Sequence, residues 1–253
     1  MSLEIFNNPK PPYKTKIIIT DTVIQYYIYE KSIIRNSSDR LSYEKSLDGL
    51  KRVSSLQRAK QNLFLTIASN VTKYSKFITL TTATTTLDRD VFLNMFNQFR
   101  KNFQRIFGYP LKYIGVLERQ KLRGIKENNE GSWHIHLVVF NSQKLHYEKL
   151  KLAWFSYGSI DIKLLRHYTH IPVYLMKYLT KEHVEFHKKT ILKSHDLKKP
   201  TIIYDYNEIV PNDKDLYRDE YYMPDDTKVL FYEKKINRSP SYKATELEEI
   251  PFN

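Results

Sequence analysis

Between residues 76 and 140 the spacing of the hydrophobic residues changes from strand-like to helical and back, which limits the folds open to this chain. Residues 76–82 (KFITLTT) form a β-branched run typical of a strand. In residues 88–107, six apolar side chains recur along one stripe, which predicts an amphipathic helix that buries the stripe. Residues 112–118 and 133–140 predict two more strands, separated by a polar loop. A helix enclosed by three strands indicates a mixed α+β domain.

The pattern continues beyond this segment. Residues 145–154 and 171–182 predict helices, and residues 159–165 predict a strand. The resulting order, β-α-β-β-α-β-α, resembles a ferredoxin-like arrangement. We therefore expect an α+β fold over residues 71–199, with a central antiparallel sheet and helices on one face.

Two flanking regions complete the expected organisation. Residues 1–70 are an N-terminal β/α extension, in which residues 14–30 predict a strand pair or hairpin and residues 52–70 predict a helix. Residues 200–253 are expected to form an acidic C-terminal tail, because residues 201–253 hold 7 Lys and Arg against 12 Asp and Glu.

The net charge of the chain points to a polyanionic partner. The formal charge is +13, and the first 200 residues hold 34 Lys and Arg against 16 Asp and Glu. A basic excess of this size favours nucleic acid, although a generically basic surface has the same composition. The chain has no cysteine, which excludes disulfides, zinc knuckles and thiolate nucleophiles. No apolar run approaches the roughly 20 residues that cross a bilayer, so we expect a cytoplasmic protein without a membrane partner.

A histidine pair is the sharpest local feature of the sequence. His134 and His136 lie two apart in a predicted strand, so their side chains project from the same face. Glu118 ends the preceding predicted strand, and an antiparallel pairing would bring its carboxylate beside the two rings. Two imidazoles and one carboxylate suit Mg²⁺ or Mn²⁺ and leave positions open for phosphate oxygens. Surface histidines, or histidines hydrogen-bonded in a core, would produce the same pattern.

The second feature is the segment Tyr174-Leu-Met-Lys177-Tyr178 with Lys181. Helical spacing places these two tyrosines and two lysines on one face. A phenol is a poor nucleophile at its usual pKa near 10, and nearby cations favour the phenolate. The chain has 20 tyrosines, so an amphipathic scaffold helix explains the pair equally well.

Taken in order, TLTT at residues 79–82, Glu118 before His134-x-His136, and Tyr174-x-x-Lys177-Tyr178 resemble the three motifs of the HUH replication initiators. The closest likeness is to rolling-circle Rep proteins of plasmids and phages, including those with two tyrosines four apart. The resemblance covers about residues 71–190. The order and spacing of the motifs are more specific than any one of them.

This resemblance implies a metal-dependent endonuclease that nicks origin DNA, either single-stranded or in a hairpin. His134, His136 and Glu118 would hold Mg²⁺ or Mn²⁺, and Tyr174 would attack the scissile phosphate to leave a 5′-phosphotyrosine and a free 3′-OH. Lys177 would stabilise charge near the phosphate, and Tyr178 would be a second nucleophile or a packing residue. No P-loop sequence is present, so a host helicase is the expected partner.

Two alternatives remain at this point. An HUH transposase would share the metal ligands and the tyrosine helix. A non-catalytic protein that binds single-stranded nucleic acid would instead stack bases on exposed aromatic residues of its sheet. Histidines on the open sheet face favour the enzyme, and aromatic residues there favour the binding protein.

Overall fold

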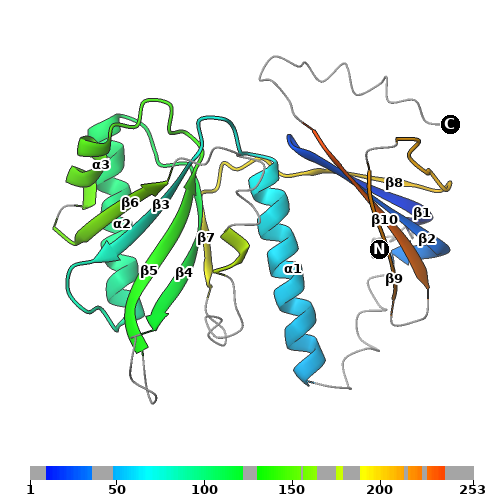
Figure 1. The fold of residues 1–253 in the computed structure, drawn as a ribbon, viewed down its shortest axis with the longest axis horizontal. Helices are drawn as coiled ribbons and strands as arrows, with labels where there is room; N and C mark the ends of the chain where they lie inside the picture. The colour runs from blue at the N-terminus through cyan, green and yellow to red at the C-terminus, as the bar shows by residue number, and fades with distance from the viewer. Residues whose placement is uncertain are drawn as a thin grey trace, which may run out of the picture. The chain divides into compact units, whose positions relative to one another are not determined.

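The computed structural model describes residues 10–35, 48–121, 130–154, 156–163, 175–178, 189–213, 216–223 and 227–236. The chain divides into two compact units. The terminal unit comprises Met1–Arg52 and Pro200–Asn253, and the central unit comprises Val53–Lys199. Each unit contains one antiparallel sheet of five strands, which confirms the expected α+β class (Figure 1).

The terminal unit combines strands from both ends of the chain. Its strands are β1 (Lys10–Ile19), β2 (Val23–Arg35), β8 (Thr201–Asp205), β9 (Tyr217–Tyr222) and β10 (Lys228–Lys235), in the order β8-β1-β2-β10-β9. The antiparallel pair β1–β2 confirms the hairpin predicted from residues 14–30. At the centre of the sheet, Tyr232 of β10 lies opposite Tyr26 of β2.

The pairing of β8, β9 and β10 with the N-terminal hairpin differs from the organisation expected from the sequence. The sequence analysis separates an N-terminal extension from an acidic tail at residues 200–253, whereas in the structure residues of both regions share one sheet. The acidic residues of this region interrupt the hydrophobic pattern, and the partner strands are about 200 residues away. Local composition therefore carried no signal for this sheet.

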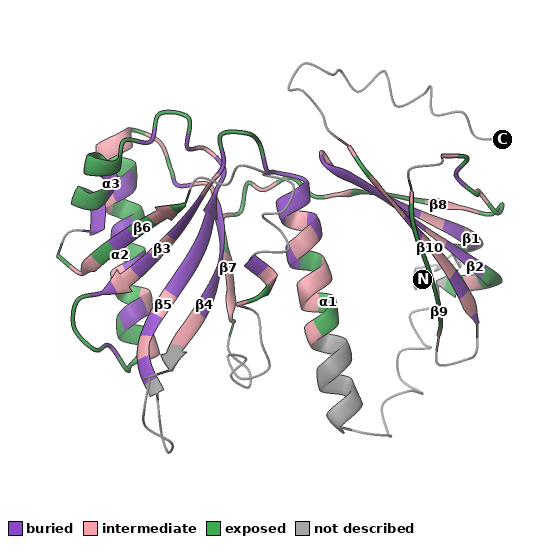
Figure 2. Ribbon diagram, viewed as in Figure 1, coloured by how far each residue is buried: buried purple, intermediate pink, exposed green. Residues whose placement is uncertain are grey.

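The central unit forms around the second sheet. Its strands are β3 (Lys76–Thr82), β4 (Tyr113–Lys121), β5 (Glu130–Val139), β6 (Gly158–Lys163) and β7 (Ile191–Lys193), in the order β6-β3-β5-β4-β7. Along β3, β4 and β5 most residues are buried, as Figure 2 shows. Strand β6 approaches β3 closely at Gly158, where an added Cβ would lie 2.0 Å from the Thr81 carbonyl oxygen.

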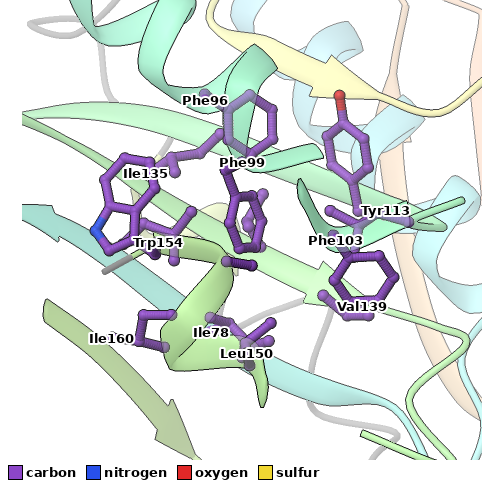
Figure 3. Packing of buried hydrophobic residues seen from close by; sticks show 14 of the residues in the cluster. Ile78, Phe96, Phe99, Phe103, Tyr113, Ile135, Val139, Leu150, Trp154 and Ile160 are labelled. Atoms are coloured by element: carbon purple, nitrogen blue, oxygen red, sulfur yellow. The ribbon is translucent and has the colours of Figure 1, made fainter. Parts of the chain in front are cut away.

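Helices α2 (Arg89–Phe107) and α3 (Tyr147–Trp154) cover one face of this sheet. Asp88 caps the start of α2 by accepting hydrogen bonds from two backbone amides, and Gly108, with φ of 79°, ends it in the left-handed conformation. The predicted apolar stripe is buried, with Phe92, Phe96, Phe99 and Phe103 each at most 1% exposed. Phe96, Phe99 and Phe103 pack in one cluster with Ile135 and Val139 of β5 (Figure 3). Each such ring contributes about 1.5–3 kcal/mol relative to an exposed position.

The opposite face of the sheet is also partly covered, where the sequence analysis placed helices on one face only. Helix α1 (Asp48–Ala68) buries Leu63 and Ile67 against Phe77, Val116 and Val138. The helix predicted for residues 171–182 lies outside the described residues except for a turn at residues 175–178. In the described part of the chain, no helix combines the length and apolar composition that a bilayer crossing requires.

Candidate active site

Three central strands arrange the sequence-predicted residues on the face opposite α2. His134 of β5 lies opposite both Thr81 of β3 and Glu118 of β4. Two positions along β5, His136 lies opposite Thr79 in the same way. Because side chains alternate between the faces of a strand, these five side chains project from one face. Strands β4 and β5 extend into the predicted polar loop and keep the register that pairs Glu118 with His134.

Glu118 and His136 are in direct contact. Nε2 of His136 lies 2.5 Å from a carboxylate oxygen of Glu118, across the diagonal between neighbouring strands. The His136 side chain is 8% exposed and that of Glu118 is 27% exposed, so the carboxylate reaches solvent while the ring is enclosed. The pair satisfies two polar groups that would be costly to bury alone.

Two threonines orient the two imidazoles, a role that the sequence analysis missed. Thr79 Oγ1 lies 3.1 Å from Nδ1 of His136, and Thr81 Oγ1 lies 3.3 Å from Nδ1 of His134. Each ring therefore directs its Nε2 away from β3. A hydroxyl both donates and accepts, so threonine can support either tautomer of the ring it contacts. The signal was present in the sequence as Thr-x-Thr, with the same period as His-x-His.

His134 carries an unmatched polar atom. Its Nε2 is buried and has no hydrogen-bond partner among the described residues. Burial lowers the pKa of His134 below its usual value, neighbouring His136 lowers it further, and Glu118 opposes the shift. A buried polar atom without a partner is rare in folded proteins, so its presence here requires an explanation.

A divalent metal fits this donor set in chemistry, although the ligands do not converge fully. The described part of the chain has no group of three or more His, Asp or Glu side chains close enough together to hold a metal ion. Glu118 and His136 touch, and the unmatched Nε2 of His134 belongs to the neighbouring row. Nδ1 contacts to Thr79 and Thr81 resemble the outer hydrogen bonds that orient metal-binding histidines.

The turn at residues 175–178 brings one tyrosine to this site. Tyr178 stacks on the ring of His136, with ring centroids 3.6 Å apart and planes 20° apart. Leu175 anchors the turn, because it is fully buried in the cluster that contains Phe77. Lys177 is exposed in the same turn. Tyr174, predicted to be the initiating nucleophile, lies outside the described residues.

A further carboxylate shares this sheet face and was not singled out from the sequence. Asp161 of edge strand β6 lies opposite Thr79, on the side of β3 away from His136. It pairs with Lys163 of the same strand at 3.9 Å, and both side chains are exposed. Asp161 therefore adds negative charge beside the site without contacting the imidazoles through any bond that the described residues show.

With this geometry established, a comparison with known families bears on the broad role of the chain. Residues 75–183 match the replication-associated protein ORF2 family. The match covers less than half of the chain. No curated protein and no solved structure matches it.

The segment matched to the ORF2 family contains the whole of the site described above, from Thr79 on β3 to Tyr178 in the turn. It also contains Asp161 and the core beneath α2. The match supports a role for this chain as a replication initiator of the Rep type.

Proposed function

We propose that this protein nicks one strand of origin DNA by tyrosine attack and later rejoins strands, as a rolling-circle replication initiator of the HUH class. The observation that carries the proposal is the contact of Glu118 with His136 on the same sheet face as His134, with Tyr178 stacked on His136. The match to the ORF2 family over the same residues supports it independently.

Each residue has a defined role in the proposed reaction. Glu118, His134 and His136 would hold Mg²⁺ or Mn²⁺, which when bound makes the scissile phosphate more electrophilic. The Tyr174 oxygen forms a bond to phosphorus as the bond from phosphorus to the 3′ oxygen breaks, and that oxygen takes up a proton. The number of phosphoester bonds stays constant, so rejoining needs no ATP. Lys177 provides positive charge for the phosphate oxygens.

The stacking of Tyr178 favours a positioning role for this residue in the nicking step. Face-to-face contact with His136 restrains both rings, and the contact depends on the aromatic ring rather than on the hydroxyl. Tyr178→Phe should therefore keep the geometry of His136. A second attack by Tyr178, in strand transfer, requires the stack to open.

Covalent capture from a random-sequence single-stranded DNA library tests the proposal. The protein is incubated with the library and Mn²⁺, denatured, and examined for DNA that remains attached. We expect an adduct whose sequenced 5′ ends share a motif, with the DNA-linked peptide containing Tyr174. Binding without an adduct would instead support the non-catalytic single-strand-binding alternative.

Two matched variants separate the tyrosines. Tyr174→Phe removes the nucleophilic oxygen and keeps the ring, so we expect DNA binding without adduct. Tyr178→Phe should still form the adduct. An adduct mapped to Tyr178 alone would reverse these assignments, and an adduct on neither residue would remove the tyrosine mechanism.

A further inference from the structure

A hollow of about 270 Å³ lies on the α2 side of the central sheet, away from the histidine face. Its lining consists of Asn97, Arg100, Lys101, Gln104, Pro110 and Leu111. The four α2 residues recur at helical spacing along one stripe, and the other two belong to the segment that leads into β4. All of the lining except Leu111 is exposed, so a ligand can enter from solvent. The volume is below that of pockets that enclose small molecules, which suits one group of a larger ligand.

The guanidinium of Arg100 is held in place within this hollow. It lies over the ring of Tyr113, 5.5 Å from the centroid, and donates a hydrogen bond of 3.3 Å to Asn97 Oδ1. The Tyr113 ring is itself buried and packs edge-on against Phe96 at 5.3 Å. Restraining a long side chain in advance reduces the entropy lost when it binds a ligand.

The chemistry of the lining suits a phosphodiester. Arg100 presents a planar fork that matches two phosphate oxygens, and Lys101 adds a second cation beside it. The side-chain amides of Asn97 and Gln104 provide further donors, while Pro110 and Leu111 form an apolar floor that a deoxyribose can contact. No acidic side chain belongs to this lining in the part of the chain that the structure describes.

The charge of the surrounding unit favours the same ligand. The central unit holds 25 Lys and Arg against 10 Asp and Glu. A field of this sign concentrates polyanions near the surface, and phosphate contacts supply most of the sequence-independent affinity for DNA. We propose that the hollow between α2 and the start of β4 binds the phosphate backbone of duplex DNA, at a site separate from the nicking site.

The position of the hollow gives this contact a distinct purpose. Tyr113, beneath Arg100, and Glu118 are five residues apart on β4, about 17 Å along the strand, and their side chains project from opposite faces. A phosphate in the hollow therefore belongs to a different stretch of DNA from the scissile phosphate. The inference rests on the proposed function only in taking DNA as the polyanion.

Binding of a short mixed-sequence DNA duplex, measured by fluorescence anisotropy over a series of salt concentrations, tests the hollow directly. In Arg100→Gln/Lys101→Gln both charges are removed, while glutamine keeps good helix propensity on the exposed face. We expect the duplex affinity to fall about tenfold. The slope of log affinity against log salt should decrease in magnitude by about 1 for each phosphate that the variant no longer neutralises.

Arg105→Gln is the matched control. Arg105 is exposed on the same helix, but it donates to Asn102 and does not line the hollow. A change of one charge outside the site should alter duplex affinity by at most about twofold at physiological salt, because screening is strong beyond about 8 Å. Thermal unfolding of each variant verifies that the fold is intact.

The outcomes separate this inference from the proposed function. Wild-type affinity and salt slope in the double variant, an equal loss in Arg105→Gln, or no duplex binding by the wild-type protein would each overturn the inference. Adduct formation with single-stranded DNA should be unchanged in the double variant. If the wild-type protein forms no adduct but the double variant still loses duplex binding, the proposed nicking function fails and the hollow remains a phosphate site.

Discussion

The two sheets of this protein have the same number of strands and the same antiparallel pairing, yet their side chains differ in kind. The central unit holds 25 Lys and Arg against 10 Asp and Glu, whereas the terminal unit holds 16 against 18. The net positive charge of the whole chain therefore belongs to the central unit. The same unit carries the histidine pair, so the electrostatic attraction for DNA and the candidate chemistry coincide.

The terminal sheet displays aromatic rings instead. On one face Tyr27 lies 5.1 Å from Phe231, which in turn lies 6.3 Å from the exposed Tyr217. Lys16 extends over the Tyr27 ring, with its ammonium 5.2 Å from the centroid. Sequence reasoning used histidines or aromatics on a sheet face to choose between an enzyme and a single-strand-binding protein. The chain has both, on separate sheets, so the two interpretations apply to different units.

The largest expected effect comes from removing both imidazoles. His134→Ala/His136→Ala should lower the rate of adduct formation by about a thousandfold or more, because several kcal/mol of transition-state stabilisation is lost at 1.36 kcal/mol per tenfold. Tyr217→Ala/Tyr221→Ala in the terminal unit should leave the rate at saturating DNA within about twofold. Rates are measured from denaturing gels with Mn²⁺. Equal losses in the two double variants would end the functional division between the units.

A stability comparison between the units gives the next largest effect. Phe99→Ala should reduce the unfolding free energy of the central unit by about 3–5 kcal/mol, since the ring is fully buried beneath α2. Tyr217→Ala, at a side chain 61% exposed, should change stability by less than about 0.5 kcal/mol. Both tryptophans, Trp133 and Trp154, belong to the central unit, so tryptophan fluorescence during urea unfolding reports that unit alone. An unchanged midpoint in Phe99→Ala would contradict the packing described for α2.

A smaller effect is expected from the threonines that orient the rings. Thr79→Val keeps the shape of the side chain and removes the hydroxyl that contacts Nδ1 of His136. Loss of such an outer hydrogen bond typically costs about 10–100-fold in metal affinity or activity. Thr79→Ser restores a hydroxyl and should recover most of the activity. The decisive measurement is the Mn²⁺ concentration at half-maximal adduct formation, which a purely structural role of Thr79 would leave unchanged.

The smallest expected effect is a pH dependence from His134. Its pKa is lowered by burial, so below the unfolded-state value near 6.5 the unfolded chain binds a proton that the folded chain does not. Stability of the metal-free central unit should therefore fall as the pH drops through 6.5, by at most about 1.4 kcal/mol per pH unit, and be independent of His134 above it. His134→Gln should remove this component from urea midpoints measured over the same range. An identical slope in the variant would assign the dependence to other groups.

Sequence reasoning was most successful where periodicity is local. The six apolar residues of the α2 stripe predict a buried face, and the alternation around His134 and His136 predicts a strand with both rings on one side. Both features are present in the structure. The placement of Glu118 beside these rings also follows from antiparallel pairing of adjacent strands. Such features depend on a few neighbouring residues and a fixed side-chain geometry.

The features that sequence reasoning missed depend on residues distant in the chain. Strand β7 has only three residues, and its pairing with β4 is set by tertiary contacts. The orienting role of Thr79 and Thr81 requires knowledge that β3 is the neighbour of β5. Likewise, the acidic residues around β9 conceal a strand that forms only beside β10. No local pattern specifies such partners.

The pairing of β2 with β10 has a consequence for the timing of folding during synthesis. The hairpin β1–β2 leaves the ribosome early, but its sheet is incomplete until β8, β9 and β10 have been made. Every residue of the central unit is translated in this interval. Domains fold as units while the chain grows, and contacts between distant segments form slowly. The nascent central unit can therefore fold first, and an exposed tyrosine-rich hairpin waits for the last strands, a period in which it depends on chaperones or on slow translation to avoid pairing with other chains.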